Sequence, residues 1–75
     1  MGLIEDIAEN AGCEYVSELK YHPERYPVHS VLRSIAAGSY DEKEWNEAVH
    51  YLIDENVPYC DSETCRKRLI GSFPV

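Results

Sequence analysis

Two cysteines near the carboxyl end of the chain are the residues whose type and spacing could do chemistry. Cys60 directly precedes Asp61, and Cys65 follows Asp61 by four residues. Asp61 has the residue type and position of a helix N-cap. Cys60 then precedes the N-cap and Cys65 holds the fourth helical position, and side chains at these two positions meet in a hydrophobic staple. The two sulfur atoms should therefore lie close together, which allows a small apolar contact, a reversible disulfide or a shared metal ion.

Zinc is the metal that such a pair would favour, but the sequence supplies an incomplete ligand set. Structural zinc sites use four ligands, often in pairs separated by about two to four residues. Cys60 and Cys65 lie at the wide end of that spacing, and only Cys13 or a histidine could be added from elsewhere. We therefore expect no cofactor, and keep zinc at Cys13, Cys60 and Cys65 as the alternative. An odd number of cysteines also favours a reducing compartment, so we expect a cytoplasmic protein.

Other catalytic patterns are missing from the sequence. It contains no glycine-rich phosphate loop, no Gly-x-Ser-x-Gly elbow, no His-Glu-x-x-His helix and no EF-hand loop. A nucleophilic Cys65 would need an oriented base, and no histidine has a spacing that supplies one. We therefore predict that the protein is not an enzyme.

The strongest helical pattern lies in the stretch from Ser39 to Asn56. Its apolar residues recur at the spacing of one helix face, namely Trp45, Ala48, Val49, Leu52 and Ile53. Asp41 is the predicted N-cap, and Glu44 is placed to bond back to the Asp41 amide in a capping box. Tyr40 and Trp45 occupy the two staple positions, so both ends of the first turn are specified by local sequence.

Four shorter patterns complete an all-α prediction. We expect helices over about residues 3–11, 13–21, 28–36 and 61–70, with glycine after the first, third and fourth. Because the link from Gly38 to Tyr40 is short, the two helices that it joins should pack against each other. The prediction is one domain over residues 1–75, a small bundle of four or five short helices. Its expected core is Leu3, Ile7, Val16, Leu19, Val31, Leu32, Ile35, Trp45, Val49, Leu52, Ile53 and Leu69.

Charge is unevenly distributed along the chain. The formal net charge is −7, and residues 1–19 hold five acidic residues and no basic one. The pattern from Asp41 to Asn56 is also acidic, whereas the last helix carries a run of three basic residues at 66–68. A negative surface repels nucleic acid and anionic membranes, so we expect neither as a partner. It also opposes a helix-turn-helix role for residues 28–56, because the supposed recognition helix begins with acidic side chains.

The leading functional hypothesis is a non-enzymatic acidic module that binds, and so inhibits or adapts, a basic partner protein. The residues expected to contact that partner lie on the first helix and on the Trp45 helix, namely Glu5, Glu9, Glu42, Glu44, Glu47 and Tyr51. The alternative is a thiol- or zinc-dependent switch centred on Cys60 and Cys65. So small a core also allows a homodimer that covers leftover apolar surface.

Overall fold

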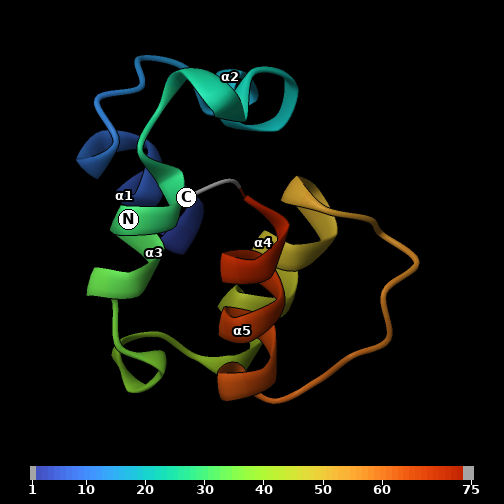
Figure 1. Cartoon of the computed structure of the whole chain (residues 1–75). Coiled ribbons are helices and arrows are strands. Elements are labelled where there is room, and N and C mark those ends of the chain that lie inside the picture. The colour runs from blue at the N-terminus through green and yellow to red at the C-terminus, as the bar shows by residue number, and fades with distance from the viewer. Residues whose placement is uncertain (1, 74–75) are drawn as a thin grey trace.

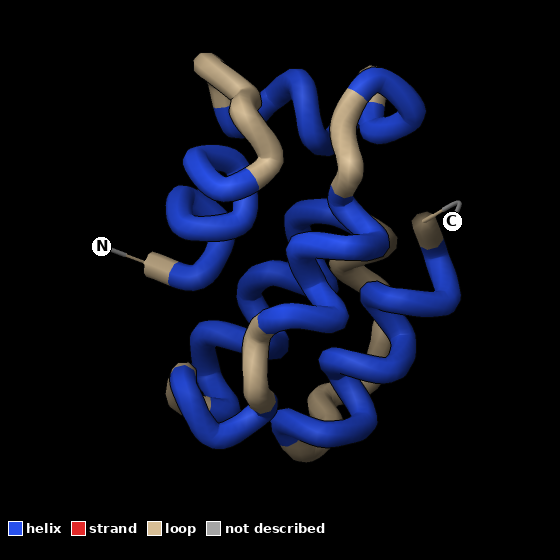
Figure 2. The backbone as a smooth tube through the Cα atoms, turned by 60° about the vertical axis from the view of Figure 1, so that its left-hand side comes forward, coloured by secondary structure: helices blue, strands red, loops and turns tan. Residues whose placement is uncertain are grey.

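The computed structural model describes residues 2–73 and shows an all-helical globule (Figure 1). The helices are α1 (Leu3–Asn10), α2 (Val16–Tyr21), α3 (Val28–Ser34), α4 (Glu42–Leu52) and α5 (Ser62–Ser72). Short 3₁₀ turns lie between them, η1 at Pro23–Arg25 and η2 at Ala37–Ser39. Figure 2 shows helices and loops, and no strand, over the described part of the chain. The predicted all-α fold is therefore confirmed.

The core is built around the Trp45 side chain, which is fully buried together with Leu3, Ile7, Leu19 and Leu32. Eight of the twelve predicted core residues are buried, and a further three are partly buried against the core. The prediction is wrong for Ile53, which is 37% exposed. Because α4 ends at Leu52, Ile53 belongs to the loop after the helix and does not continue the apolar stripe of α4.

Glycine ends α1 as expected. Gly12 has φ +78°, a left-handed conformation that side-chain-bearing residues rarely adopt. The Gly12 amide donates to the Glu9 carbonyl, and the Cys13 amide donates to the Ala8 carbonyl at 2.8 Å. The turn therefore satisfies the last carbonyls of α1 and directs the chain toward α2.

The two helices joined by the short link do not form the main contact of the core. Figure 1 shows α3 beside α1, with α4 packed behind α5. The contacts agree, because α3 packs against α1 and α5, whereas α4 packs most extensively against α5. The chain leaves α3 at Ile35 in an extended conformation and passes through η2, which separates the two helices and brings α5 against both.

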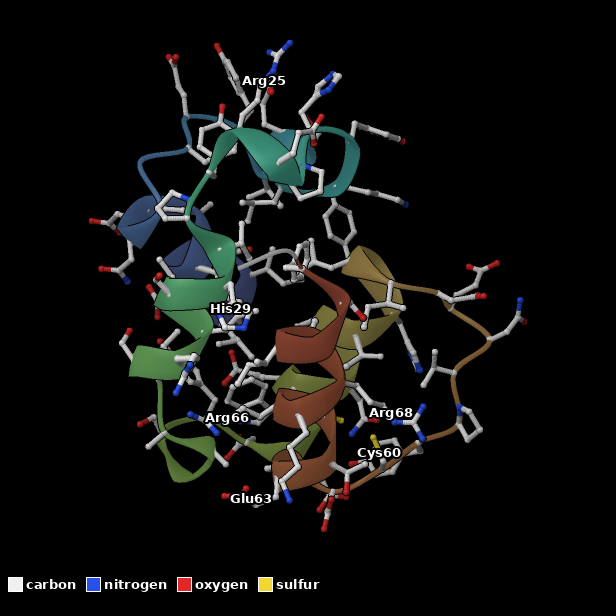
Figure 3. All side chains as sticks on the ribbon, viewed as in Figure 1. Arg25, His29, Cys60, Glu63, Arg66 and Arg68 are labelled. Carbon is white, nitrogen blue, oxygen red and sulfur yellow. The ribbon has the colours of Figure 1, made fainter. Side chains whose placement is uncertain are left out.

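Arg66, the first residue of the basic run in the last helix, contacts a helix other than its own. The sequence predicts that Gly71 stops α5 just after the run, but the helix continues to Ser72, so the basic residues lie in its middle. Arg66 instead reaches α3, where Nε donates to the Ile35 carbonyl at 2.7 Å and Nη2 to the Arg33 carbonyl at 3.1 Å. Figure 3 shows Arg66 pointing from α5 toward α3. Its positive charge therefore complements the carboxyl end of α3 rather than that of α5.

None of the helices within residues 2–73 is long and apolar enough to cross a bilayer.

Candidate functional site

Helices α1 and α4 pack against each other, and both carry acidic residues. Glu5, Asp6 and Glu9 come from α1, and Glu44 and Glu47 come from α4; we call these five residues the acidic surface. Where the two helices meet, Glu5, Glu44 and Glu47 line a small open hollow of about 60 Å³. Pockets for organic ligands are usually several hundred Å³, so this hollow suits water rather than a small-molecule substrate.

Two of these carboxylates are engaged at the amino end of α1. Glu5 Oε1 accepts the Gly2 amide at 2.9 Å, and Glu44 Oε1 accepts the Leu3 amide at 3.2 Å. The predicted capping box between Glu44 and Asp41 is therefore wrong, because the Glu44 carboxylate caps a different helix. Asp41 holds the N-cap position of α4 but makes no side-chain capping bond. Glu44 thus fixes α4 against α1, and together with Glu5 it places two negative charges at the positive end of the α1 dipole.

Asp6 is tied to the start of α4. The Tyr40 hydroxyl donates to Asp6 Oδ2, and this bond, together with burial, raises the pKa of Tyr40 to about 12. The Tyr40 ring meets Trp45 edge-on, with centroids 6.3 Å apart, which confirms the predicted staple. Asp6 therefore helps to join α1 to α4, while Glu9 and Glu47 extend into solvent.

Two of the predicted partner-binding residues have other neighbours. Glu42 projects from another side of α4, where burial and then the neighbouring Glu42 carboxylate raise the pKa of the Tyr59 phenol. Tyr51 lies one turn beyond Glu47 and is half-buried, with the Lys20 ammonium 5.0 Å from its ring centroid. The acidic surface thus includes Glu5, Glu9, Glu44 and Glu47 of the predicted set, but not Glu42, and Tyr51 lies beside it under a cation.

The acidic surface lacks cationic partners within the described chain. Among residues 2–73, the ion pair within 4 Å is His22 with Glu24, at 3.8 Å and remote from this surface. Lys43 precedes Glu47 by one helical turn, yet the two side chains do not form such a pair. The charges on Glu9 and Glu47 are therefore left to solvent and to any molecule that docks there.

The thiol pair, Cys60 and Cys65, lies where the loop between α4 and α5 meets the first turns of α5. Cys60 Sγ and Cys65 Sγ lie 2.8 Å apart, and both are free cysteines. Asp61 is the N-cap of α5 and accepts the Thr64 amide at 2.9 Å, so the predicted staple geometry is confirmed. Cys65 is fully buried, and burial, followed by its hydrogen bond with Cys60, raises its pKa to about 12.

Cys13 lies apart from the thiol pair. It occupies the turn between α1 and α2, where its thiol donates to the Tyr15 carbonyl at 2.8 Å. Within residues 2–73, no group of three or more His, Cys, Asp or Glu side chains is placed to hold a metal ion. The structure therefore brings together Cys60 and Cys65 but not the full set proposed for zinc.

Asn46 is the functional-site neighbour that the sequence analysis missed. Its side chain is only 3% exposed and pairs with both backbone groups of Cys60. Nδ2 donates to the Cys60 carbonyl at 2.7 Å, and Oδ1 accepts the Cys60 amide at 3.0 Å. The one sequence signal was an uncharged polar residue beside Trp45, at the border of the apolar stripe of α4.

In comparisons with known proteins, no protein-family model matches the chain, and no curated protein or solved structure shows significant similarity to it. Its function must therefore be argued from the acidic surface and the thiol pair themselves.

Proposed function

We propose that this protein is a non-enzymatic binding module whose acidic surface docks on a basic partner protein, which it inhibits or adapts. The observation that carries the proposal is the juxtaposition of α1 and α4, which places Glu5, Glu44 and Glu47 around one hollow. Asp6 and Glu9 add two more carboxylates on α1, and none of the five has a cationic partner within 4 Å among residues 2–73. Like charges held together raise the local negative potential and attract Lys- or Arg-rich surfaces. A partner supplying those cations would relieve the repulsion between the carboxylates.

The roles of the five residues differ within this proposal. Glu5, Asp6 and Glu44 are held by the hydrogen bonds described above, so they set the shape of the surface as well as its charge. Glu9 and Glu47 are exposed, and within residues 2–73 neither carboxylate makes such a bond. We therefore assign direct contact with the partner mainly to Glu9 and Glu47, which can be altered without removing the contacts between α1 and α4.

The test compares two double variants of equal net charge. In Glu9→Gln/Glu47→Gln the acidic surface loses two charges, whereas Glu14→Gln/Glu63→Gln removes two exposed charges elsewhere. Binding to a fluorescein-labelled peptide of alternating lysine and arginine is followed by anisotropy at low and at physiological salt. At about 0.5 kcal/mol for each exposed ion pair, the first variant should bind about fivefold more weakly than the wild type.

The control variant should bind within about twofold of the wild type, because its two charges lie outside the acidic surface. Equal weakening of both variants would show that the peptide responds to net charge alone and would contradict the proposal. Circular dichroism of each variant establishes that the helices are retained.

A further inference from the structure

The two sulfur atoms of the thiol pair lie close enough for a small movement to form a disulfide bond. Cys60 Sγ and Cys65 Sγ are 2.8 Å apart, and a disulfide bond requires about 2.05 Å. The sulfur atoms therefore need to move together by less than 1 Å. Cys65 Sγ also approaches the Cys60 carbonyl at 3.6 Å, so the thiol of α5 already points at the residue it would join.

The backbone on both sides of this gap is held in place. Asn46 binds the amide and the carbonyl of Cys60, while Asp61 caps the first turn of α5 that carries Cys65. Because these bonds fix the two residues before any reaction, closure would order little additional chain. Asn46 Oδ1 also lies 3.9 Å from Cys60 Sγ, which places a polar acceptor beside that thiol.

Access to the two thiols is unequal. Cys65 is fully buried, whereas Cys60 is partly exposed at the edge of the molecule. Figure 3 shows Cys60 beside the first turn of α5, on the side away from His29 and α3. A reagent in solution can therefore reach Cys60 before it reaches Cys65.

From this arrangement we propose that Cys60 and Cys65 form a reversible intramolecular disulfide by exchange with a low-molecular-weight disulfide such as oxidised glutathione. The Cys60 thiolate attacks one sulfur of the reagent, forming a mixed disulfide and releasing one reduced thiol. Cys65 then loses its proton to water and attacks Cys60 Sγ, which expels the second reduced thiol. Two electrons pass from the protein thiols to the reagent, and a reduced dithiol reverses both steps.

The buried position of Cys65 also sets the order of the steps. Its pKa of about 12 keeps the thiol protonated at neutral pH, so the first attack belongs to Cys60. Once Cys60 is in the mixed disulfide, Cys65 is the nearest thiol, and Cys13 lies in a different turn of the molecule. The reaction should therefore be specific for this pair.

The test uses the full chain, reduced and then incubated with oxidised glutathione, followed by alkylation, intact mass and peptide mapping. The wild type and Cys13→Ser should each lose two alkylatable thiols, retain no glutathione and yield a Cys60–Cys65 cross-linked peptide. Cys65→Ser should instead retain one glutathione on Cys60, and Cys60→Ser should lose most of the reactivity. If Cys65→Ser fails to fold, Cys65→Ala supplies the same measurement.

The wild-type result decides the proposal without any variant. Retention of all three thiols, a stable glutathione adduct in place of the cross-link, or a cross-link that involves Cys13 would each overturn it. Dithiothreitol should restore two alkylatable thiols to the oxidised wild type, and a cross-link resistant to it under native conditions would contradict reversibility.

Discussion

Replacing Asn46 with alanine should be among the most destabilising polar substitutions in this protein. The side chain makes three hydrogen bonds, to the carbonyls of Glu42 and Cys60 and from the Cys60 amide, at 2.7–3.0 Å. Each such bond contributes about 0.5–1.5 kcal/mol, and the two Cys60 groups left unpaired add a desolvation penalty. We expect a loss of about 2–4 kcal/mol from a total that is about 4–11 kcal/mol for a domain of this length.

A matched control separates the tertiary bonds from the local one. Asn10 Nδ2 donates to the Asp6 carbonyl at 2.8 Å, the same bond to the fourth preceding residue that Asn46 makes to Glu42, but it is exposed. Asn10→Ala should therefore change stability by no more than about 0.5 kcal/mol.

Urea unfolding followed by Trp45 fluorescence measures both variants, since Trp45 is the single tryptophan of the chain. In thermal melts the melting temperature of Asn46→Ala should be lower than that of the wild type by at least about 8 °C, at about 4–8 °C for each kcal/mol. A difference between the two variants below about 1 kcal/mol would refute the view that Asn46 holds the α4–α5 loop in place.

Three further predictions follow from single features of the structure. Closing the ring of residues 60–65 should raise the free energy of unfolding by about 2 kcal/mol, seen as a higher urea midpoint for the oxidised protein and absent in Cys60→Ser. Gly12→Ala should cost about 1 kcal/mol or more because φ is +78°, whereas Gly38→Ala, with open space around it and no positive φ, should be nearly neutral in the same melts. The pKa of Tyr40 is about 12 in the folded protein and about 10 in the unfolded chain. The stabilisation by the Tyr40–Asp6 hydrogen bond is therefore complete below about pH 10 and is lost as the pH rises through 12. Tyr40→Phe should therefore show a shallower loss of stability over that window, and phenolate absorbance should lose a component that titrates near pH 12; an unchanged titration would contradict the bond to Asp6.

Local signals explain why much of the fold could be predicted. Asp61 as an N-cap, Gly12 as a helix end and the Tyr40–Trp45 staple all depend on residues within a few positions of one another. Such contacts are specified by spacing alone. The closeness of Cys60 and Cys65 belongs to the same class, which is why this part of the candidate site was predicted.

The features that could not be predicted depend on distant partners. The spacing predicts that the Glu44 carboxylate accepts a hydrogen bond from the nearby Asp41 amide. In the structure it accepts one from the Leu3 amide, which is distant in the sequence. Arg66 likewise binds the end of α3, a contact that no local pattern in the sequence indicates. Nothing in the spacing of residues reveals which helix end will arrive beside a long charged side chain. That depends on packing of the whole core.

Helix α4 links the two sites through neighbouring side chains that face different ways. Glu44 reaches α1 and organises the acidic surface, whereas Asn46, two residues later, reaches Cys60 and organises the thiol pair. Successive residues on a helix are separated by about 100°, so side chains two apart project to nearly opposite sides. Trp45 lies between them and is fully buried, which anchors both positions in the core. Because one rigid turn carries all three residues, the acidic surface and the thiol pair share a scaffold while their exposed groups remain separate. A partner docked on Glu9 and Glu47 would therefore leave Cys60 open to reagents.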